Sequence, residues 1–594
     1  MLMNNLFNRT ILYRINLKNK TKLFLGLILV HFCNANVLFT DVTNISGINF
    51  SGQSEGVCVF DYNNDGLDDI FFTTRGGSRF YLYKNEGGMM FIDETISSNL
   101  GVIVEGRTPV AGDYDNDGDL DLFIGNANGQ SLLFQNDGSG QFQDITSISG
   151  ISVTNQVRGC SWVDYDGDGF IDLYVGLLHT SNKMYRNIGD GTFIDVAQTI
   201  GIEGPSTAGV IMGLGFIDYD RDGDQDLFIT QDNNLGNILY KNEGEYFIDV
   251  SNYTDVNLNV MGMGVAFGDI NRDGYFDFYT TNLYENSLLI NSETNIFSDI
   301  SEPSGTEDIP GSMGWGTFFF DANNDGWVDI YNNNETGFGG IPNSLFINNS
   351  DSTFTMLGEE SGVVLSNNGY GSGFGDFDQD GDLDLILVGH SSQAGSINLL
   401  RNDSDFQNWI IFNLSQENEN IFSIGATVEL FTSNGNQINF VGAGNGYCSQ
   451  NTFEVHFGLG DETQVDSIQV SWPDGLIESF YDFTINSRNS IIKGNSLAIS
   501  NSSSPDNFNY GMKNIYPNPF NNNSVINIVS IQDTEGDMSI YNVWGRLVEH
   551  NIIQLYEGQT NIIDLNLQNV PSGVYFIRID TDYFTDYKKI TLIK

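Results

Sequence analysis

The stretch Asp113-Tyr114-Asp115-Asn116-Asp117-Gly118-Asp119-Leu120-Asp121 decides the fold, because its pattern, D-x-[DN]-x-D-G-x-x-D, returns along the chain at a nearly constant interval. The seven copies start 51 to 55 residues apart, at Asp61, Asp113, Asp164, Asp218, Asp269, Asp321 and Asp376. Even spacing over this many copies predicts a repeat architecture in which each repeat is one supersecondary unit.

Each copy presents oxygen-bearing side chains at its first, third, fifth and ninth positions, and the glycine at the sixth permits a sharp turn. A backbone carbonyl at the seventh position adds a further oxygen. Because no copy contains Cys or His, the pattern favours a hard cation over zinc, copper or iron, and we expect about one Ca²⁺ per repeat. The expected ligands are Asp61, Asn63, Asp65, Leu67 and Asp69; Asp113, Asp115, Asp117, Asp119 and Asp121; Asp164, Asp166, Asp168, Phe170 and Asp172; Asp218, Asp220, Asp222, Asp224 and Asp226; Asp269, Asn271, Asp273, Tyr275 and Asp277; Asp321, Asn323, Asp325, Trp327 and Asp329; and Asp376, Asp378, Asp380, Asp382 and Asp384.

The seven copies fall into two classes by the number of carboxylates at these positions. Copies one, five and six have Asn63, Asn271 and Asn323 at the third position and carry three carboxylates, whereas the other copies carry four. Ligand charge tunes calcium affinity, so copies one, five and six are expected to be the weaker sites. The alternative is that all seven loops are solvated turns that only connect strands.

The flanks of the loops exclude an EF-hand, which needs a Glu at position twelve and a helix on either side. Position twelve is instead Phe72, Ile124, Val175, Ile229, Thr280, Asn332 or Leu387. Short aromatic and β-branched runs on both sides of each loop are typical of strands. Each loop is therefore expected to join two strands of one sheet.

A short Phe-x-Asp segment ends most repeats and gives four strands per repeat. A further copy, Phe39-Thr40-Asp41, precedes the first loop, while none follows the last loop. The N-terminal strand is therefore expected to complete the last sheet and to leave no free edge. We predict an all-β fold: a seven-bladed β-propeller followed by a small β domain and a C-terminal β-sandwich-like domain.

Copies such as Phe216 to Asp224 resemble the FG-GAP or VCBS-type repeats of integrin-like propellers. The resemblance covers roughly residues 37 to 405. It implies a propeller whose blades hold calcium in this loop.

The pattern changes near Trp409, where we expect a small separate β domain. This region resembles the ASPIC/UnbV module, through Ile424-Gly425-Ala426, Gly444-Asn445-Gly446-Tyr447, His456-Phe457-Gly458-Leu459-Gly460 and Trp472-Pro473-Asp474-Gly475. A propeller paired with this module is similar to the cartilage acidic protein family of animals and to its bacterial relatives, a resemblance that implies no defined biochemical activity.

The C-terminal region resembles the type A sorting domain of type IX secretion, through Tyr516-Pro517-Asn518-Pro519-Phe520, Ser572 to Ile577 and Lys588-Lys589-Ile590. This resemblance implies a Gram-negative, Bacteroidota-like host, recognition by the type IX secretion machinery, and a protein that is released or attached to the outer-membrane surface. From its residues alone, the region is a small β-sandwich adhesion module.

The expected organisation is a signal peptide over 1–35, the propeller over 36–405, the ASPIC/UnbV-like domain over 406–485, a linker over 486–512 and the sorting domain over 513–594. The signal peptide is predicted from basic residues that precede the apolar run Leu23 to Phe32. No segment of the mature chain approaches the roughly 20 apolar residues that a membrane-spanning helix needs. Cys58 and Cys160 lie in apolar strands and are expected to be buried and unpaired.

The composition bears on partners, because 24 basic against 77 acidic residues give a net charge of −53. Such a chain is expected to repel nucleic acid and to attract cations or cationic partners. Hydrophobic residues make up 40% of the chain, which is ample for several cores and argues against disorder.

Three functions fit these patterns. The first is a secreted or cell-surface calcium-binding propeller that acts in adhesion, ligand binding or scaffolding, with an extracellular glycan or protein as its ligand and no catalysis of its own. The alternative is a polysaccharide-active enzyme, a lyase or glycoside hydrolase, on a calcium-stabilised propeller. In the third, the ASPIC/UnbV-like domain carries recognition and the propeller is a spacer. No catalytic motif such as H-E-x-x-H occurs, and the histidines stand alone, so we predict no enzymatic activity and no catalytic residue.

Overall fold

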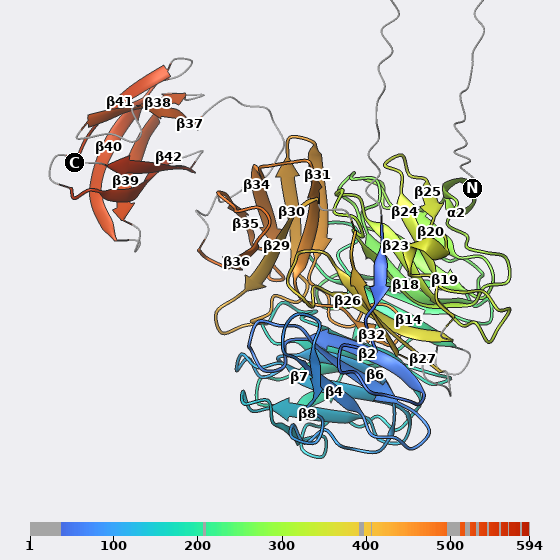
Figure 1. Cartoon of the computed structure of the whole chain (residues 1–594). Coiled ribbons are helices and arrows are strands. Elements are labelled where there is room, and N and C mark those ends of the chain that lie inside the picture. Colours follow the sequence, from blue (N-terminus) through green and yellow to red (C-terminus); the bar gives the residue numbers. More distant parts are fainter. Residues whose placement is uncertain are drawn as a thin grey trace, which may run out of the picture. The chain divides into compact units, whose positions relative to one another are not determined.

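The computed structural model describes residues 37–205, 209–366, 368–390, 397–404 and 407–495, and then 511–516, 523–529, 534–542, 546–556, 560–567, 570–581 and 585–592 (Figure 1). The predicted signal peptide lies outside the described residues, as does most of the predicted linker.

The first part of the chain folds into four-stranded antiparallel sheets, one per repeat, as predicted. The first four repeats form β2 (Ser54–Phe60), β3 (Asp69–Thr74), β4 (Tyr81–Asn85) and β5 (Phe91–Asp93); β6 (Glu105–Gly112), β7 (Asp121–Asn128), β8 (Leu132–Asn136) and β9 (Phe142–Asp144); β10 (Val157–Val163), β11 (Asp172–Leu177), β12 (Lys183–Asn187) and β13 (Phe193–Asp195); and β14 (Ile211–Ile217), β15 (Asp226–Gln231), β16 (Ile238–Asn242) and β17 (Phe247–Asp249). In every sheet the acidic loop joins the first strand to the second.

The last three repeats have the same order. They form β18 (Gly262–Gly268), β19 (Asp277–Asn282), β20 (Ser287–Ile290) and β21 (Ser298–Asp299); β22 (Gly314–Phe320), β23 (Asp329–Asn334), β24 (Ser344–Asn348) and β25 (Phe354–Met356); and β26 (Gly369–Gly375), β27 (Asp384–Gly389) and β28 (Ile397–Asn402). Three single-turn helices, α1 (Ala197–Ile200), α2 (Ser301–Ser304) and the 3₁₀ helix Glu359–Ser361, follow fourth strands in the described residues.

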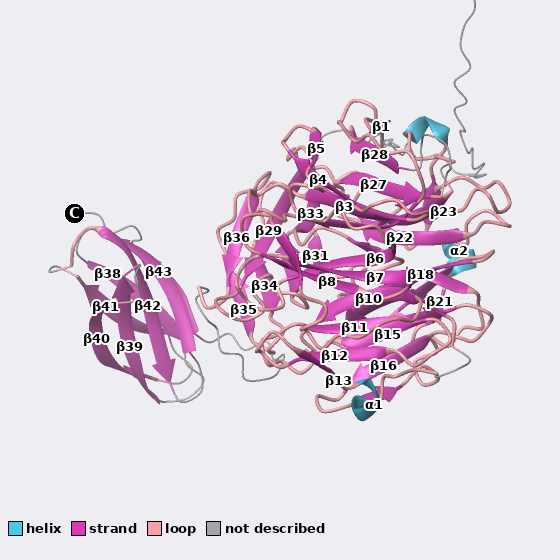
Figure 2. Ribbon diagram, turned by 90° about the horizontal axis from the view of Figure 1, so that it is seen from below, coloured by secondary structure: helices cyan, strands magenta, loops and turns pink. Residues whose placement is uncertain are grey.

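The N-terminal strand closes the ring, as predicted. β1 (Phe39–Asp41) pairs antiparallel with β28, with Phe39 opposite Asn402, and Figure 2 shows it beside β28 and β27. Phe39 is buried in the same cluster as Phe320 and Leu400. The first strand of each sheet contacts that of the next, and β26 contacts β2, so these strands surround a common centre.

A second domain follows, built from two further sheets. One sheet has the order β33 (Val455–Gly460), β29 (Asn408–Ser415), β36 (Arg488–Ile492), and the other β31 (Gly435–Phe440), β30 (Thr427–Thr432), β34 (Ser467–Ser471), β35 (Ile477–Phe480). β36 pairs in parallel with β29 and lies beyond the boundary predicted at residue 485. The domain therefore extends into the segment that we had expected to be linker.

Between β31 and β33, residues 443–451 leave the second domain and enter the centre of the propeller. We call them the central segment. Within it, β32 (Ser449–Gln450) adds to the first sheet in parallel with β2 (Figure 1), Ala443 forms a bridge with Trp162, and Gly446 forms one with Leu214. Gly444 and Gly446 have φ of +92° and +96°, and a Cβ on Gly444 would lie 2.3 Å from Cys160 O. Only glycine fits such close approaches without strain.

The central segment touches the inner strands of the remaining sheets as well. The Gln450 Oε1 accepts a hydrogen bond of 2.9 Å from Ala111 N, and Asn451 Oδ1 accepts one of 3.2 Å from Phe374 N. Tyr447 is fully buried in a cluster with Met263 and Trp315, its ring centroid 4.7 Å from that of Trp315.

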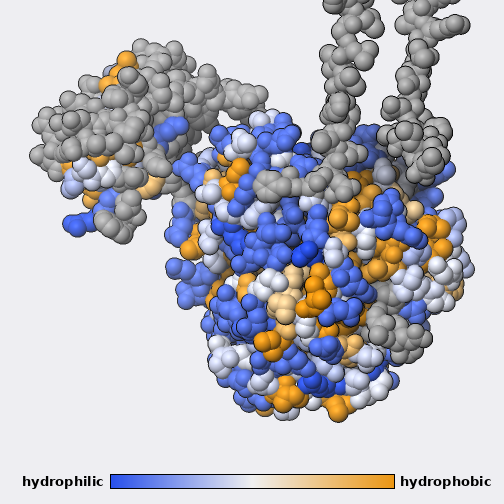
Figure 3. All heavy atoms as spheres, in the orientation of Figure 1, coloured by the Kyte–Doolittle hydropathy of each residue, from blue (hydrophilic) through white to orange (hydrophobic). Residues whose placement is uncertain are grey.

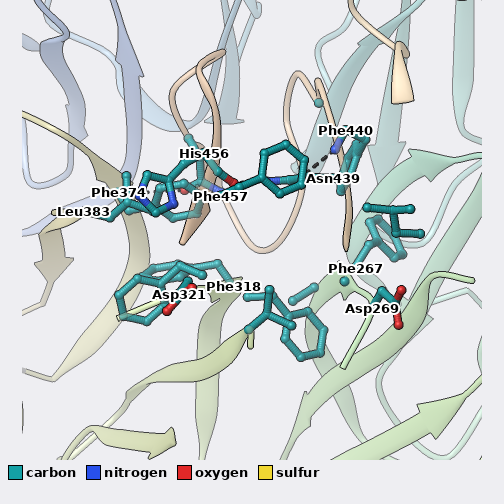
Figure 4. A pocket seen from close by; sticks show the side chains of 18 of the residues that line it. Phe267, Asp269, Phe318, Asp321, Phe374, Leu383, Asn439, Phe440, His456 and Phe457 are labelled. Carbon is teal, nitrogen blue, oxygen red and sulfur yellow. Dashed lines mark hydrogen bonds between the residues drawn. The ribbon is translucent and has the colours of Figure 1, made fainter. Parts of the chain in front are cut away.

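The small β domain expected after the propeller is present, but it shares a buried core with the propeller. One buried cluster joins Trp162 and Leu173 of the propeller to Phe412, Val428 and Trp472 of the second domain. One gap at the seam has a volume of about 90 Å³, below the roughly 300 Å³ of a small-molecule site. Figure 4 shows it between Phe318 and Asp321 on one side and His456 and Phe457 on the other.

The C-terminal domain is a sandwich of two sheets around its own core, as predicted. The sheets are β37 (Gly511–Tyr516), β38 (Asn523–Val529), β41 (Thr560–Asn566), and β40 (Leu547–Leu555), β39 (Thr534–Asn542), β42 (Gly573–Thr581), β43 (Thr585–Leu592). Both contribute to a buried cluster that includes Ile526 and Ile577.

Candidate metal centres in the acidic loops

In four loops, the carboxylates of the first, third and ninth positions converge. In each set, one candidate ligand atom from each residue lies within 4.8 Å of those of the other two. The sets are Asp113, Asp115 and Asp121; Asp164, Asp166 and Asp172; Asp218, Asp220 and Asp226; and Asp376, Asp378 and Asp384. These are copies two, three, four and seven, the copies with Asp at the third position, so each of them can hold a metal ion.

Backbone N–H groups hold the first-position and ninth-position carboxylates of each set in place. In loop two, Asp113 Oδ1 accepts a hydrogen bond from Asp117 N at 3.1 Å, and its Oδ2 accepts one from Gly118 N at 2.9 Å. Asp121 is fully buried at the start of β7 and accepts from Tyr114 N at 3.2 Å and Asn136 N at 2.8 Å. Both groups are thus oriented before any ion arrives.

The third-position carboxylate keeps one oxygen unused. The Oδ1 atoms of Asp115, Asp166, Asp220 and Asp378 are buried and have no hydrogen-bond partner among the described residues. In loops two to four a side chain of the third strand holds the other oxygen: Gln135 Nε2 donates to Asp115 Oδ2 at 2.6 Å, Arg186 Nε to Asp166 Oδ2 at 2.6 Å, and Lys241 pairs with Asp220. A buried anionic oxygen without a partner is unfavourable, and a cation in the set would satisfy it.

Burial shifts the acidity of these groups. Removal from water raises the pKa of Asp113, Asp164 and Asp218 to about 7, and the neighbouring carboxylates add to the shift. Burial likewise raises the pKa of the ninth-position groups Asp121 and Asp172 well above the usual range. The converging groups therefore resist full ionisation at neutral pH unless a cation compensates them.

Copies one, five and six have Asn in place of the third-position carboxylate. Asn63 Nδ2 lies 3.5 Å from Asp69 Oδ2, so Asn63 occupies the place that Asp115 takes in loop two. Asn271 and Asn323 instead contact the fifth-position groups, Asp273 at 3.1 Å and Asp325 at 3.0 Å. These copies offer one fewer charge to an ion.

The convergent sets do not include the fifth-position carboxylates. The fifth-position Oδ1 accepts a hydrogen bond from the seventh-position N, as in Asp117 with Asp119 N at 3.0 Å. Their role as calcium ligands stays a prediction.

One Asn, which the sequence patterns did not single out, lies at the end of the third strand of every repeat or directly after it. Its backbone N donates to the ninth-position carboxylate, and its side chain reaches into the preceding sheet. Asn136 Nδ2, for example, donates to Leu120 O at 3.2 Å in its own loop and to Tyr62 O at 2.8 Å in loop one. The equivalents are Asn85, Asn187, Asn242, Asn291, Asn348 and Asn402. Asn85 reaches Phe377 O in loop seven, so these contacts run around the ring, and the recurrence of Asn at this strand end is the signal that identifies them.

Asn136→Ala is expected to destabilise the propeller by about 2–4 kcal/mol, because two buried carbonyls lose their donor. The measurement is urea unfolding of the full chain in saturating calcium. Asn44→Ala, in an exposed turn, is the matched control. Equal midpoints for the two variants would contradict the role of Asn136.

Neighbouring loops are also joined directly, through the fourth position. This residue has φ near +60° in every loop. Its side chain donates to the sixth-position carbonyl of the next loop in most copies: Asn64 to Gly118, Asn116 to Gly169, Arg221 to Gly274, Arg272 to Gly326, Asn324 to Gly381 and Gln379 to Gly66.

The second domain rests on the same loops. Arg488 donates to Asp376 Oδ2 at 2.8 Å, His456 Nε2 lies 3.0 Å from Gly381 O, and Gly460 N donates to Asn324 O at 2.7 Å. Because Arg488 already neutralises part of loop seven, that copy has less negative charge available for an ion than its four carboxylates indicate.

Other residues that the sequence pointed to are structural. Cys58, Cys160 and Cys448 are buried and unpaired, as predicted for the first two.

Comparison with known proteins agrees with this architecture. The chain matches the FG-GAP-like repeat over residues 61–124, 113–175, 177–229, 218–280 and 321–387, the ASPIC and UnbV family over 416–498, and the secretion system C-terminal sorting domain over 514–594. The chain therefore contains FG-GAP-like repeats, an ASPIC/UnbV domain and a C-terminal sorting domain. The sorting domain indicates a secreted or cell-surface protein.

Its similar relatives include cartilage acidic protein 1 of Homo sapiens, 23% identical over 456 residues that cover 72% of this chain and 61% of that protein. The Xenopus tropicalis protein of the same name is 26% identical over 469 residues, 71% of this chain and 70% of that protein. The chain thus spans less than two thirds of the human protein. Among solved structures, Sqt1 of Saccharomyces cerevisiae aligns with 62% of this chain and 99% of its own at a TM-score of 0.37 and 11% identity.

Within the described residues, no helix combines the length and apolar character needed to cross a membrane.

Proposed function

We propose that this protein is an exported calcium-binding β-propeller that serves in adhesion, ligand binding or scaffolding and has no catalytic activity of its own. The observation that carries the calcium assignment is the buried, unpartnered Oδ1 of Asp115, Asp166, Asp220 and Asp378, each facing two further carboxylates. Oxygen-only donor sets on irregular loops suit Ca²⁺, which takes six to eight oxygens.

The position of the loops supports a structural role for the ion. Each loop joins the two inner strands of a sheet, and the Asn contacts and fourth-position contacts connect it to its neighbours. An ion in each loop would hold these strands and contacts in place.

The binding role is supported by the surface. Hydrophilic side chains predominate on the face drawn in Figure 3, with hydrophobic ones between them. The central segment fills the middle of the propeller, where its Tyr447 is fully buried. We therefore expect recognition on the exposed loops.

Calorimetric titration of the calcium-free full chain tests the proposal. We expect uptake of about one ion per loop, at the millimolar or lower dissociation constants of extracellular modules. Absence of saturable uptake would make the loops solvated turns. Product release from a polysaccharide, lost on mutation of a carboxylate outside the loops, would instead favour the enzyme.

The charge classes give a sharper prediction. Asp115→Asn reduces loop two to three carboxylates. We expect it to lower the calcium affinity of that one site by on the order of tenfold. Asp137→Asn removes the same charge from an exposed turn nearby and is the control. If the two variants bind calcium alike, the effect reflects net charge rather than coordination.

A further inference from the structure

The contacts between neighbouring loops are interrupted at one place. Loop three has Gly167 at its fourth position, with φ of +67°, so it has no side chain to donate to Gly223 O of loop four. A Cβ built on Gly167 would meet nothing within 4 Å. The two loops are therefore separated where the other described neighbours are bonded.

A cavity of about 250 Å³ occupies this interval. Its walls are Asp166 and Gly167 of loop three, Gly223 and Asp224 of loop four, and Asp474 and Gly475 of the second domain. The size is below that of a small-molecule site, roughly 300 Å³ or more, and suits the end of a single side chain.

The equivalent positions in the other loops indicate what kind of group would bind in this cavity. In loops two and seven, the seventh-position carboxylates Asp119 and Asp382 accept from Asn64 at 2.7 Å and Asn324 at 2.6 Å, the side chains that also reach the sixth-position carbonyl. Asp224 is the equivalent carboxylate in loop four, it is exposed, and none of the hydrogen bonds between described side chains involves its carboxylate. The acceptor pair Gly223 O and Asp224 thus has no side-chain donor among the described residues.

Guanidinium groups fill two of the equivalent places. Arg221 NH1 donates to Gly274 O at 2.9 Å, and Arg272 Nε donates to Gly326 O at 2.9 Å while its guanidinium lies 4.2 Å from the Trp327 ring centroid. The geometry of these loops therefore accepts an arginine. Arginine also suits a wall of carboxylates, because its planar fork of donors pairs with carbonyl and carboxylate oxygens.

We propose that the cavity between loops three and four, which we call the loop gap, receives an arginine side chain from a basic protein partner. The arginine would donate to Gly223 O and Asp224 and would lie beside Asp474 of the second domain, whose Oδ2 already accepts a hydrogen bond from Lys493 Nζ at 2.7 Å. The proposal rests on the ligand-binding role proposed above and names the partner chemistry, a basic segment attracted by a chain of net charge −53.

The test uses the calcium-loaded full chain and a fluorescent peptide, Gly-Ser-Gly-Arg-Gly-Ser-Gly, with citrulline replacing arginine in a second peptide. Binding is followed by fluorescence anisotropy at about 150 mM salt, where exposed charges more than roughly 8 Å apart are screened. We expect saturable binding of the arginine peptide and at least tenfold weaker binding of the citrulline peptide. No saturable binding of the arginine peptide would overturn the proposal.

Gly167→Asn is the decisive variant, because Asn64, Asn116 and Asn324 adopt the same positive φ at this position in other loops. The new side chain would occupy the loop gap and lower peptide affinity at least tenfold. Asp224→Asn is expected to weaken the peptide as well, whereas Asp119→Asn, at the equivalent place in loop two, leaves it unchanged. Equal peptide affinity in wild type and Gly167→Asn would assign binding to general charge and overturn the proposal.

Calcium titration of Gly167→Asn separates this proposal from the proposed function. Unchanged ion uptake with lost peptide binding supports the loop gap. Failure of ion uptake in the wild-type chain would count against the calcium assignment. Peptide binding would then be tested only by the comparison of wild type with Gly167→Asn.

Discussion

Chelation of calcium is expected to lower the unfolding temperature of the propeller by about 10 °C or more. A ligand at 100 times its dissociation constant stabilises the folded state by about 2.7 kcal/mol per site. Several occupied loops together therefore match the whole net stability of about 5–15 kcal/mol that is typical of a domain. Without the ions, the buried Oδ1 atoms of Asp115, Asp166, Asp220 and Asp378 again have no partner.

Differential scanning calorimetry of the full chain, before and after addition of EGTA, measures this effect. The C-terminal domain has its own core and no acidic loop of this pattern, so its transition is the internal control. EGTA already saturated with calcium controls for the chelator. A propeller transition that moves no more than the C-terminal one would exclude a stabilising role for calcium.

Removal of the second domain is expected to leave a propeller that does not fold into a stable, soluble form. Without the central segment, Trp162, Leu214 and Trp315 lose the contacts that bury them, and Val57 N loses its 3.1 Å bond to Cys448 O. Loss of the buried Tyr447 side chain alone is expected to destabilise the fold by about 3–5 kcal/mol.

The comparison is between chains that span residues 37–404 and 37–495, measured by soluble yield and thermal unfolding in calcium. The longer chain keeps the shared core and lacks only the C-terminal domain, so we expect it to unfold cooperatively. A soluble shorter chain with the same unfolding temperature would show that the propeller is independent of the second domain. The same dependence means that deletion of the second domain does not test whether the propeller is only a spacer.

Much of the propeller follows from the sequence because its signals are local. The loop pattern sets the two inner strands, the Phe-x-Asp segments set the fourth strands, and the unmatched copy at Phe39 identifies the strand that closes the ring. The convergence of Asp113, Asp115 and Asp121 also follows from spacing, because the glycine turn returns the chain to where it began.

The position of residues 443–451 does not follow from local pattern. Gly444-Asn445-Gly446-Tyr447 has the composition of an exposed turn, and its burial depends on close approach to strands nearly 300 residues earlier. The Asn contacts were missed for a related reason. The distance from the acidic loop to this Asn varies from one repeat to the next. Its partners also lie in another repeat, as when Asn136 donates to Tyr62 O. The fourth position was missed because Asn, Arg, Gln and Gly share only a positive φ there.

Closure of the ring by β1 sets the order in which the protein can assemble. Thr40 and Asp403, which are hydrogen-bonded at 2.5 Å, are 363 residues apart, whereas the four consecutive strands of each of the first six repeats are joined by short local connections. Closing so long a loop costs only about 2 kcal/mol more than closing one of about 50 residues, so the join is thermodynamically inexpensive. It is nevertheless expected to form slowly, because folding slows as the sequence separation of the contacting residues grows. Until the seventh repeat has been synthesised, β1 has no partner strand. Until β1 then pairs with β28, the outer edge of β28 stays unpaired.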